Sequence, residues 1–179
     1  MISAMDLRRS RYVPPLLGCC VVFVVCGCLR LCPSTIILPV FCRIPAEIAS
    51  RYYNAGLQTP ELVFSAHGLF FTVARSCAAT DFFSLVTGLL TYLCIRKRSA
   101  VLALAIPPLA WVITITANTV RLILLVPATA FMHRYLPEKA FAACHQAVGT
   151  LVFLTAFILL WEGVRYINRG EPTQLDSNR

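Results

Sequence analysis

Four long apolar runs set the strongest limit on how this chain can fold. They extend over residues 14–31, 77–95, 100–132 and 145–164. Each holds roughly the 20 apolar residues that a helix needs to cross a bilayer. Hydrophobic residues make up 58% of the 179 residues and charged residues only 13%, about half the share of an average soluble domain. The sequence therefore predicts an all-α fold, a polytopic membrane helical bundle with four spans.

Basic residues beside these runs predict how the helices cross the membrane. The net charge is +8, and the basic clusters that flank the runs are Arg8, Arg9 and Arg11, then Arg96, Lys97 and Arg98, and finally Arg165 and Arg169. Such clusters mark the cytoplasmic ends of spans. Both termini are thus expected in the cytoplasm, in a multi-pass protein of the cytoplasmic (inner) membrane. No basic patch is interleaved with aromatic residues, so the expected partner is the lipid bilayer and not nucleic acid.

One integral membrane domain over residues 1–179 is expected, because the spans leave no room for a separate soluble domain. Residues 1–13 would form a basic cytoplasmic tail, and residues 33–74 an external segment. The core that carries the candidate site is expected over residues 75–164. The polar residues 170–179 are expected to form a disordered tail.

The external segment is the least regular part of the sequence. Its apolar stretches are too short to span, so one or two short re-entrant or interfacial helices are expected there. Residues 62–74 could instead lengthen the following span. The first apolar run shows no cleavage site of the small-x-small type and is expected to remain as an anchor.

The run 100–132 is longer than one upright span requires. The favoured arrangement is a span that begins near Ala100 and reaches the outer boundary at residues 118–121. Residues 122–132 would then turn back as a short embedded helix. The alternative is a span that begins after Pro108 and continues to the end of the run.

This topology places Cys77, Arg121 and His145 at the outer ends of three different spans. A cysteine attacks a carbonyl carbon as the thiolate, which a nearby cation and a helix amino terminus favour. A histidine can accept the thiol proton and later protonate a leaving amine. An arginine can bind a substrate carboxylate or stabilise the oxyanion of a tetrahedral intermediate. Together the three residues indicate a cysteine-dependent acyl transfer.

Three further polar residues are candidates for a supporting role. Asn118 lies three residues before the arginine and hence on the same helical face. Arg75 precedes the cysteine by two residues. Asp81 follows the cysteine by four residues, on its helical face, and is expected either to orient His145 or to pair with Arg75.

The other cysteines and histidines are weaker candidates. Five of the nine cysteines lie in or at the end of the first apolar run, where cysteine behaves as a small hydrophobe, namely Cys19, Cys20, Cys26, Cys28 and Cys32. No Cys-x-x-Cys occurs, so neither a metal site nor a cofactor is predicted. Cys144 adjoins His145, but neighbours in a helix point about 100° apart, which makes Cys144 the second choice of nucleophile. His67 and His133 have no assigned thiol.

Three short motifs surround the candidate residues. They are Cys77-Ala78 at the opening of a span, Ala117-Asn118-Thr119-Val120-Arg121-Leu122, and His145-Gln146-Ala147-Val148-Gly149 leading to Phe153. In this order and context they resemble the exosortase and archaeosortase transpeptidases, and the small size resembles the exosortase K type. Members of that family have a cysteine, an arginine in an Asn-x-x-Arg setting, and a histidine followed four residues later by glycine. The resemblance covers residues 75–164.

The resemblance implies roles for these residues. Cys77 would be the nucleophile, Arg121 its basic partner and His145 the acid/base, with Gly149 as a supporting residue. The implied substrate is a secreted protein whose carboxy-terminal sorting signal combines a short motif, a transmembrane helix and a basic cluster. That signal would be cut at the extracytoplasmic face, and the acyl product would pass to an acceptor.

Two departures from the family pattern bear on these roles. Many members carry glycine two residues after the cysteine, where this chain has Ala79. Most members are also longer at the amino terminus, which leaves open whether the short amino-terminal half recognises the substrate's helix alone or with a partner.

Two other classes of function remain open at this point. One is a non-catalytic membrane protein, such as an assembly factor or a transporter subunit, in which the polar residues only hold spans together. A transporter would place its polar groups near the middle of the membrane, between broken helices. The other is a thiol redox or metal-handling protein, which would need a second cysteine near Cys77. Cys144 is the outer neighbour that could serve.

Overall fold

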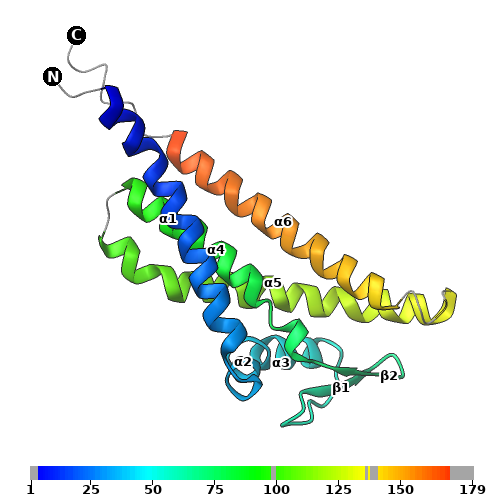
Figure 1. Cartoon of the computed structure of the whole chain (residues 1–179). Coiled ribbons are helices and arrows are strands. Elements are labelled where there is room, and N and C mark those ends of the chain that lie inside the picture. Colours follow the sequence, from blue (N-terminus) through cyan, green and yellow to red (C-terminus); the bar gives the residue numbers. More distant parts are fainter. Residues whose placement is uncertain (1–3, 98–99, 136, 138–140, 170–179) are drawn as a thin grey trace.

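The computed structural model describes residues 4–97, 100–135, 137 and 141–169 and is mostly helical (Figure 1). The expected tail at 170–179 lies outside these residues. The elements in chain order are α1 (Ala4–Leu31), α2 (Ser34–Phe41), α3 (Arg43–Tyr52), β1 (Val63–Ala66), β2 (Leu69–Thr72), the 3₁₀ turn η1 (Arg75–Cys77), α4 (Thr80–Lys97), α5 (Ala100–Tyr135) and α6 (Phe141–Arg169). In Figure 1 the start of α1 and the end of α6 lie at the same end of the molecule.

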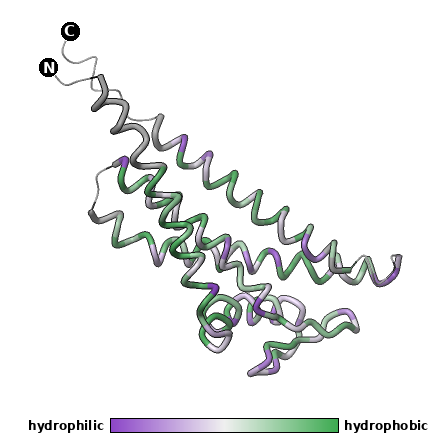
Figure 2. Tube along the Cα trace, in the orientation of Figure 1, coloured by the Kyte–Doolittle hydropathy of each residue, from purple (hydrophilic) through white to green (hydrophobic). Residues whose placement is uncertain are grey.

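In the described part of the chain, three helices are long and apolar enough to cross a membrane. They cover Arg75–Arg96, Ala103–Tyr135 and His145–Tyr166. A fourth span results if Leu16–Leu31 and Ser34–Phe41, which meet at an angle of 116°, are counted together. Figure 2 shows the long apolar stretches in these helices and a more mixed pattern between α1 and α4. The chain is thus a helical membrane protein, with three or four candidate spans where the sequence predicted four.

Helix α5 differs from the favoured prediction. It is one continuous helix of 36 residues, about 54 Å long at roughly 1.5 Å per residue, and residues 122–132 do not turn back. The stretch after Arg121 contains no glycine and no polar break, and Pro127 is accommodated inside the helix. The helix continues beyond the apolar run to Tyr135. Arg121 therefore lies well inside α5 and not at its end.

The external segment contains the two short helices that were predicted, α2 and α3, but also an unpredicted β-hairpin. Residues 62–74 neither form a helix nor lengthen a span. Strand β1 pairs antiparallel with β2, with Ala66 opposite Leu69. The two turn residues, His67 and Gly68, have φ angles of 52° and 76°, as the two-residue hairpin turn requires. Aromatic and β-branched residues on both strands favour this structure over a helix.

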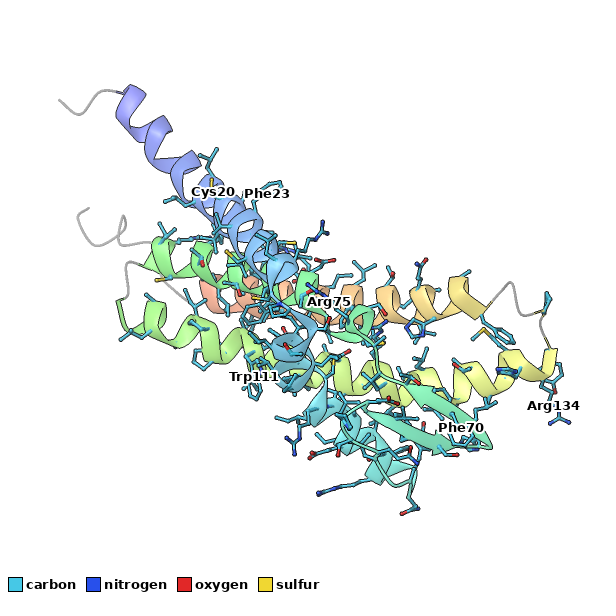
Figure 3. All side chains as sticks on the ribbon, turned by 60° about the horizontal axis from the view of Figure 1, so that its bottom comes forward. Cys20, Phe23, Phe70, Arg75, Trp111 and Arg134 are labelled. Atoms are coloured by element: carbon cyan, nitrogen blue, oxygen red, sulfur yellow. The ribbon has the colours of Figure 1, made fainter. Side chains whose placement is uncertain are left out.

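The external segment is fixed to α5 by specific contacts. The Tyr53 hydroxyl donates to the Ile123 carbonyl at 2.6 Å, and Nε1 of Trp111 donates to the Val40 carbonyl at 2.9 Å (Figure 3). Residues of α2, α3 and the hairpin share one buried cluster with the middle of α5. A second cluster joins α4, α5 and α6. Cys77 belongs to the first cluster and Ala79 to the second, so the turn between them lies where the two cores meet.

Helices α1 and α4 approach each other closely through two glycines. A Cβ added to Gly88 would clash with the Val22 side chain, and one added to Gly18 would lie 3.2 Å from the Gly88 carbonyl oxygen. In a bilayer, helices associate mainly through such van der Waals contact between small residues. The glycines therefore hold α1 against the helix that follows Cys77.

Gly88→Val is expected to push α1 away from α4 and to lower the free energy of unfolding by about 1–3 kcal/mol, as overpacking does. Gly27→Val is the matched control, because nothing lies within 4 Å of a Cβ at Gly27. Thermal melting in detergent micelles measures the difference. Equal melting temperatures for the two variants would contradict this account of the contact.

Candidate active site

Cys77 lies in a short turn ahead of α4 and not in the helix itself. It is the last residue of the 3₁₀ turn η1. The backbone of Ala78 is in the right-handed helical conformation, whereas that of Ala79 is in the left-handed conformation, with a φ angle of 52°. Helix α4 begins only at Thr80. The sequence predicted that the helix begins at Cys77, whereas it begins three residues later. The left-handed conformation of Ala79 prevents the helix from extending back to the cysteine. The Cys77 side chain is 3% exposed.

The structure brings the three predicted residues together. The Cys77 Sγ lies 3.8 Å from Nε2 of His145, and Nη2 of Arg121 lies 3.1 Å from the same nitrogen. A guanidinium has only donors, so Nε2 must be the acceptor of this hydrogen bond and the imidazole is then neutral with its proton on Nδ1. The nitrogen that faces the thiol therefore carries the lone pair.

Arg121 is held in a narrow space beside α6. Its side chain is 5% exposed although it carries a charge. A Cβ added to Gly149 would lie 2.7 Å from Nε of Arg121, so only glycine leaves room for the guanidinium here. The guanidinium also lies over the Phe153 ring at 5.4 Å from its centroid, a cation–π contact. These contacts give a physical reason for glycine four residues after the histidine.

Asn118 fixes the backbone that carries the thiol. Its side chain is 0% exposed, and Nδ2 donates to the Cys77 carbonyl at 2.8 Å and to the Phe41 carbonyl at 3.3 Å. Asn118 and Arg121 share a face of α5, as predicted from their spacing. One turn of α5 therefore does two things. Its Asn118 fixes the backbone of Cys77, and its Arg121 places a positive charge beside His145.

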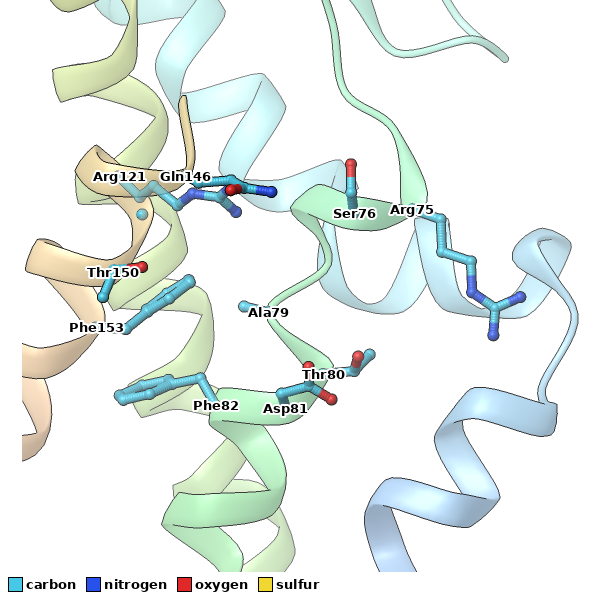
Figure 4. Close-up of a pocket in the computed structure, with 11 residues that line it drawn as sticks. Arg75, Ser76, Ala79, Thr80, Asp81, Phe82, Arg121, Gln146, Thr150 and Phe153 are labelled. Atoms are coloured by element: carbon cyan, nitrogen blue, oxygen red, sulfur yellow. The ribbon is translucent and has the colours of Figure 1, made fainter. Parts of the chain in front are cut away.

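Two cavities meet at these residues. A polar cavity of about 430 Å³ is lined by Arg121, Gln146 and Thr150 together with residues of the turn before α4 (Figure 4). A second cavity of about 180 Å³ is lined by Cys77 and His145. The Arg121–His145 contact thus lies between a polar space and the space that contains the thiol.

Asp81 and Arg75 line the polar cavity, but the partners predicted for Asp81 are wrong. Asp81 neither orients His145 nor pairs with Arg75: its Oδ1 lies 3.7 Å from Nη2 of Arg30 and accepts from the Cys26 thiol at 3.3 Å. Arg75 points away from Arg121 (Figure 4) and donates to the carbonyls of Leu29 and Arg30. The break at Ala79 rotates Asp81 away from the face of the cysteine. Arg75 instead satisfies carbonyls at the carboxyl end of α1.

The structure also places the other cysteines and histidines. Burial raises the pKa of the Cys42 thiol to about 12, with Cys77 nearby adding to the shift, so Cys42 stays protonated. His67 is exposed at the hairpin turn, with its ring against Tyr53. His133 lines the cavity of Cys77, although the sequence assigned no thiol to it. The side chain of Cys144 lies outside the described part of the structure.

In the part of the chain that the structure describes, no group of three or more His, Cys, Asp or Glu side chains is arranged to hold a metal ion. Two buried atoms there have no hydrogen-bond partner, namely Oδ1 of Asn118 and Nε of Arg121. Unpaired polar atoms are costly in a buried position. Both belong to residues that contact Cys77 or His145.

Ala79→Gly is expected to leave the stability unchanged or to raise it by up to about 1 kcal/mol. A left-handed conformation costs a residue with a Cβ about 1–2 kcal/mol, and the greater freedom of glycine in the unfolded chain offsets part of this gain. Ala78→Gly is the control, because Ala78 is buried and has a φ angle of −73°. The Ala78→Gly substitution should lower the free energy of unfolding by about 1 kcal/mol. Melting temperatures that fall equally in both variants would contradict the role of the Ala79 conformation.

Comparison with known proteins identifies the family. The sequence profile described as "Transmembrane exosortase (Exosortase_EpsH)" matches residues 61–162, which is more than half of the chain. The match begins just before the hairpin and ends in α6, so it contains Cys77, Arg121 and His145. No curated protein and no solved structure matched the chain. The chain belongs to the transmembrane exosortase family.

Proposed function

We propose that this protein is a membrane-embedded cysteine transpeptidase of the short, exosortase K type. It cleaves the carboxy-terminal sorting signal of secreted proteins at the extracytoplasmic face and transfers the acyl product to an acceptor. The observation that carries the proposal is the contact of the Cys77 thiol and the Arg121 guanidinium with one nitrogen of His145. Family membership supports the same chemistry.

The first step is the transfer of the thiol proton. Nε2 of His145 carries the ring's lone pair and lies 3.8 Å from the Cys77 sulfur, so the proton can pass from sulfur to this nitrogen as the hydrogen bond from Arg121 is released. The product is a thiolate beside an imidazolium. Nε2 then no longer accepts a hydrogen bond, and the Arg121 guanidinium loses its acceptor. Its donors become available to a substrate in the adjoining polar cavity.

The second step is attack on the scissile carbonyl. The thiolate forms a sulfur–carbon bond, and the electron pair of the carbonyl moves to oxygen. The Arg121 guanidinium stabilises this oxyanion. Because Arg121 is buried, the surrounding low dielectric strengthens the interaction. The Phe153 ring and the bare Gly149 backbone keep the guanidinium at this position.

The third step expels the leaving amine. The imidazolium of His145 returns its proton to the amide nitrogen, the carbon–nitrogen bond breaks, and a thioester remains on Cys77. An acceptor nucleophile then attacks the thioester carbonyl, and its proton passes to His145. The carbon–sulfur bond breaks, and the imidazolium returns this proton to the sulfur, which restores the Cys77 thiol. Burial raises the pKa of the Cys42 thiol to about 12, which disfavours the thiolate that an attacking cysteine needs.

The basic clusters support the membrane orientation that this function needs. Arg96 and Lys97 end α4, and Arg165 lies near the end of α6. If both ends are cytoplasmic, the turn with Cys77 and the start of α6 with His145 lie toward the opposite face. The active site would then meet secreted proteins while their own transmembrane helix still holds them.

The test is processing of a co-expressed secreted protein that ends in a short motif, a transmembrane helix and basic residues. Cys77→Ala is expected to abolish release of that helix. His145→Ala should slow it about 10²–10⁴-fold, and Arg121→Lys about 10²–10³-fold, because an ammonium lacks the planar fork of donors. Cys28→Ala, at an exposed thiol of α1, is the control. Normal processing by Cys77→Ala protein would overturn the proposal.

Gly149→Ala is expected to slow processing at least tenfold without lowering the melting temperature much. The added methyl group would lie 2.7 Å from Nε of Arg121, so the guanidinium must shift from its position beside His145. Gly163→Ala, on the same helix with nothing within 4 Å of the new Cβ, should process substrate at the normal rate. Rates from a time course of helix release compare the two. Full activity in Gly149→Ala would show that the Arg121–His145 contact is dispensable.

A further inference from the structure

The outer edge of strand β2 carries backbone groups that the hairpin does not use. Val63 exchanges both of its backbone hydrogen bonds with Gln58, on the far side of β1. Val63 lies opposite Thr72, so these two residues form a non-hydrogen-bonded pair. In an antiparallel ladder such pairs alternate. Ser65 and Phe70 therefore form another, and the N–H and C=O groups of Phe70 and Thr72 point away from β1.

No described residue hydrogen-bonds to these groups of Phe70 and Thr72. The backbone bonds outside the helices and strands do not include them. Phe70 is 77% exposed (Figure 3). An edge strand with unpaired groups is a template for another strand unless something blocks it. The part of β2 that the structure describes carries no proline, no bulge and no charge that would do so.

This edge forms one wall of the cavity that contains the thiol. Every residue from Leu69 to Val73 lines the cavity, whereas β1 contributes only Phe64. The side chains of alternate residues in a strand point to opposite faces. Consecutive residues can therefore line one wall of a cavity only if the backbone edge of the strand faces that cavity. The opposite wall is α5, through Leu122, Leu125 and Thr129.

The cavity leads to the reacting groups. Cys77 and His145 line it together with β2, and only Val73 to Ser76 separate the strand from the cysteine. A peptide that paired with β2 would therefore have its backbone next to the thiol. The apolar side chains of α5 would meet its alternate side chains, and the paired backbone would be fixed without regard to sequence.

We propose that the free edge of β2 is the substrate-binding site of this protein, where an extended peptide segment flanking the scissile bond adds as a third strand. This inference rests on the proposed function for the identity of the peptide. Addition of a strand to an open edge is a recurrent mode of peptide recognition, with affinity from the backbone and selectivity from alternate side chains. The thiol at the end of the strand would then meet a substrate in a fixed register.

The first test measures peptide binding and requires no cleavage. Full-length Cys77→Ala protein in nanodiscs is used to select binders from a display library of random decapeptides. Phe70→Pro, added to this protein, removes one outward N–H and is expected to weaken the selected peptides about tenfold, the cost of one backbone hydrogen bond with an unpaired partner. Phe70→Ala keeps the N–H and isolates the effect of the ring.

Ser65→Pro is the matched control. It removes an N–H from the same rung of the hairpin, but at the opposite edge. Both proline variants strain the hairpin alike, so loss of binding in Phe70→Pro alone supports the proposal. Equal affinity for the Phe70→Pro and Phe70→Ala proteins, or equal loss in Phe70→Pro and Ser65→Pro, would overturn it.

The second test leaves the hairpin unchanged. The tightest decapeptide is synthesised with a single N-methyl group at each amide in turn. A paired strand predicts weakening of about tenfold at every second amide and little change between them, because only alternate N–H groups face β2. Sensitivity without this alternation would overturn the proposal. The two proposals can fail separately. If the Cys77→Ala protein binds peptides with the alternating pattern but still cleaves the sorting signal, the proposed function is wrong and the proposed binding site is supported.

Discussion

The nitrogen Nε2 of His145 is the atom on which the rest of the site depends. It accepts a hydrogen bond from Arg121 and faces the Cys77 sulfur, so one nitrogen links the group that would attack to the group that would stabilise the product of attack. In the proposed mechanism a single proton transfer changes both contacts at once. The thiol would become a nucleophile, and the guanidinium would lose its acceptor. This coupling explains why three elements far apart in sequence must meet at one point.

Contacts between the helices keep Cys77, Arg121 and His145 in this arrangement. Gly149 removes a side chain so that α6 can lie against the Arg121 guanidinium. Asn118 holds the carbonyl of Cys77, and Arg75 ties the same turn to the carboxyl end of α1. The Gly18–Gly88 contact keeps α1 against α4. Charged and polar groups inside a membrane protein are costly, and here each of them fixes the backbone or the partner of another.

The sequence predicted which residues meet but not the path of the chain between them. The lengths of the apolar runs and their basic flanks placed Cys77 and His145 at the outer ends of their spans, because these features follow from the bilayer itself. Arg121 meets them from the interior of α5 and not from its end, where the sequence had placed it. The prediction for the partners of Asp81 failed for a local reason. The prediction extended the helix back to the cysteine, whereas Ala79 is left-handed. The hairpin and the uninterrupted α5 were missed because short apolar segments fit helix and strand alike, and tertiary contacts decide.

Detection of a covalent intermediate on Cys77 tests the central claim most directly. Protein mixed with excess sorting-signal substrate is quenched in acid within one turnover, digested and analysed by mass spectrometry. The account predicts that the peptide containing Cys77 carries the amino-terminal product as a thioester, which hydroxylamine removes, and that His145→Ala protein accumulates less of it. A thioester on another cysteine, such as Cys144, or cleavage that proceeds with no adduct on any cysteine, would contradict the account.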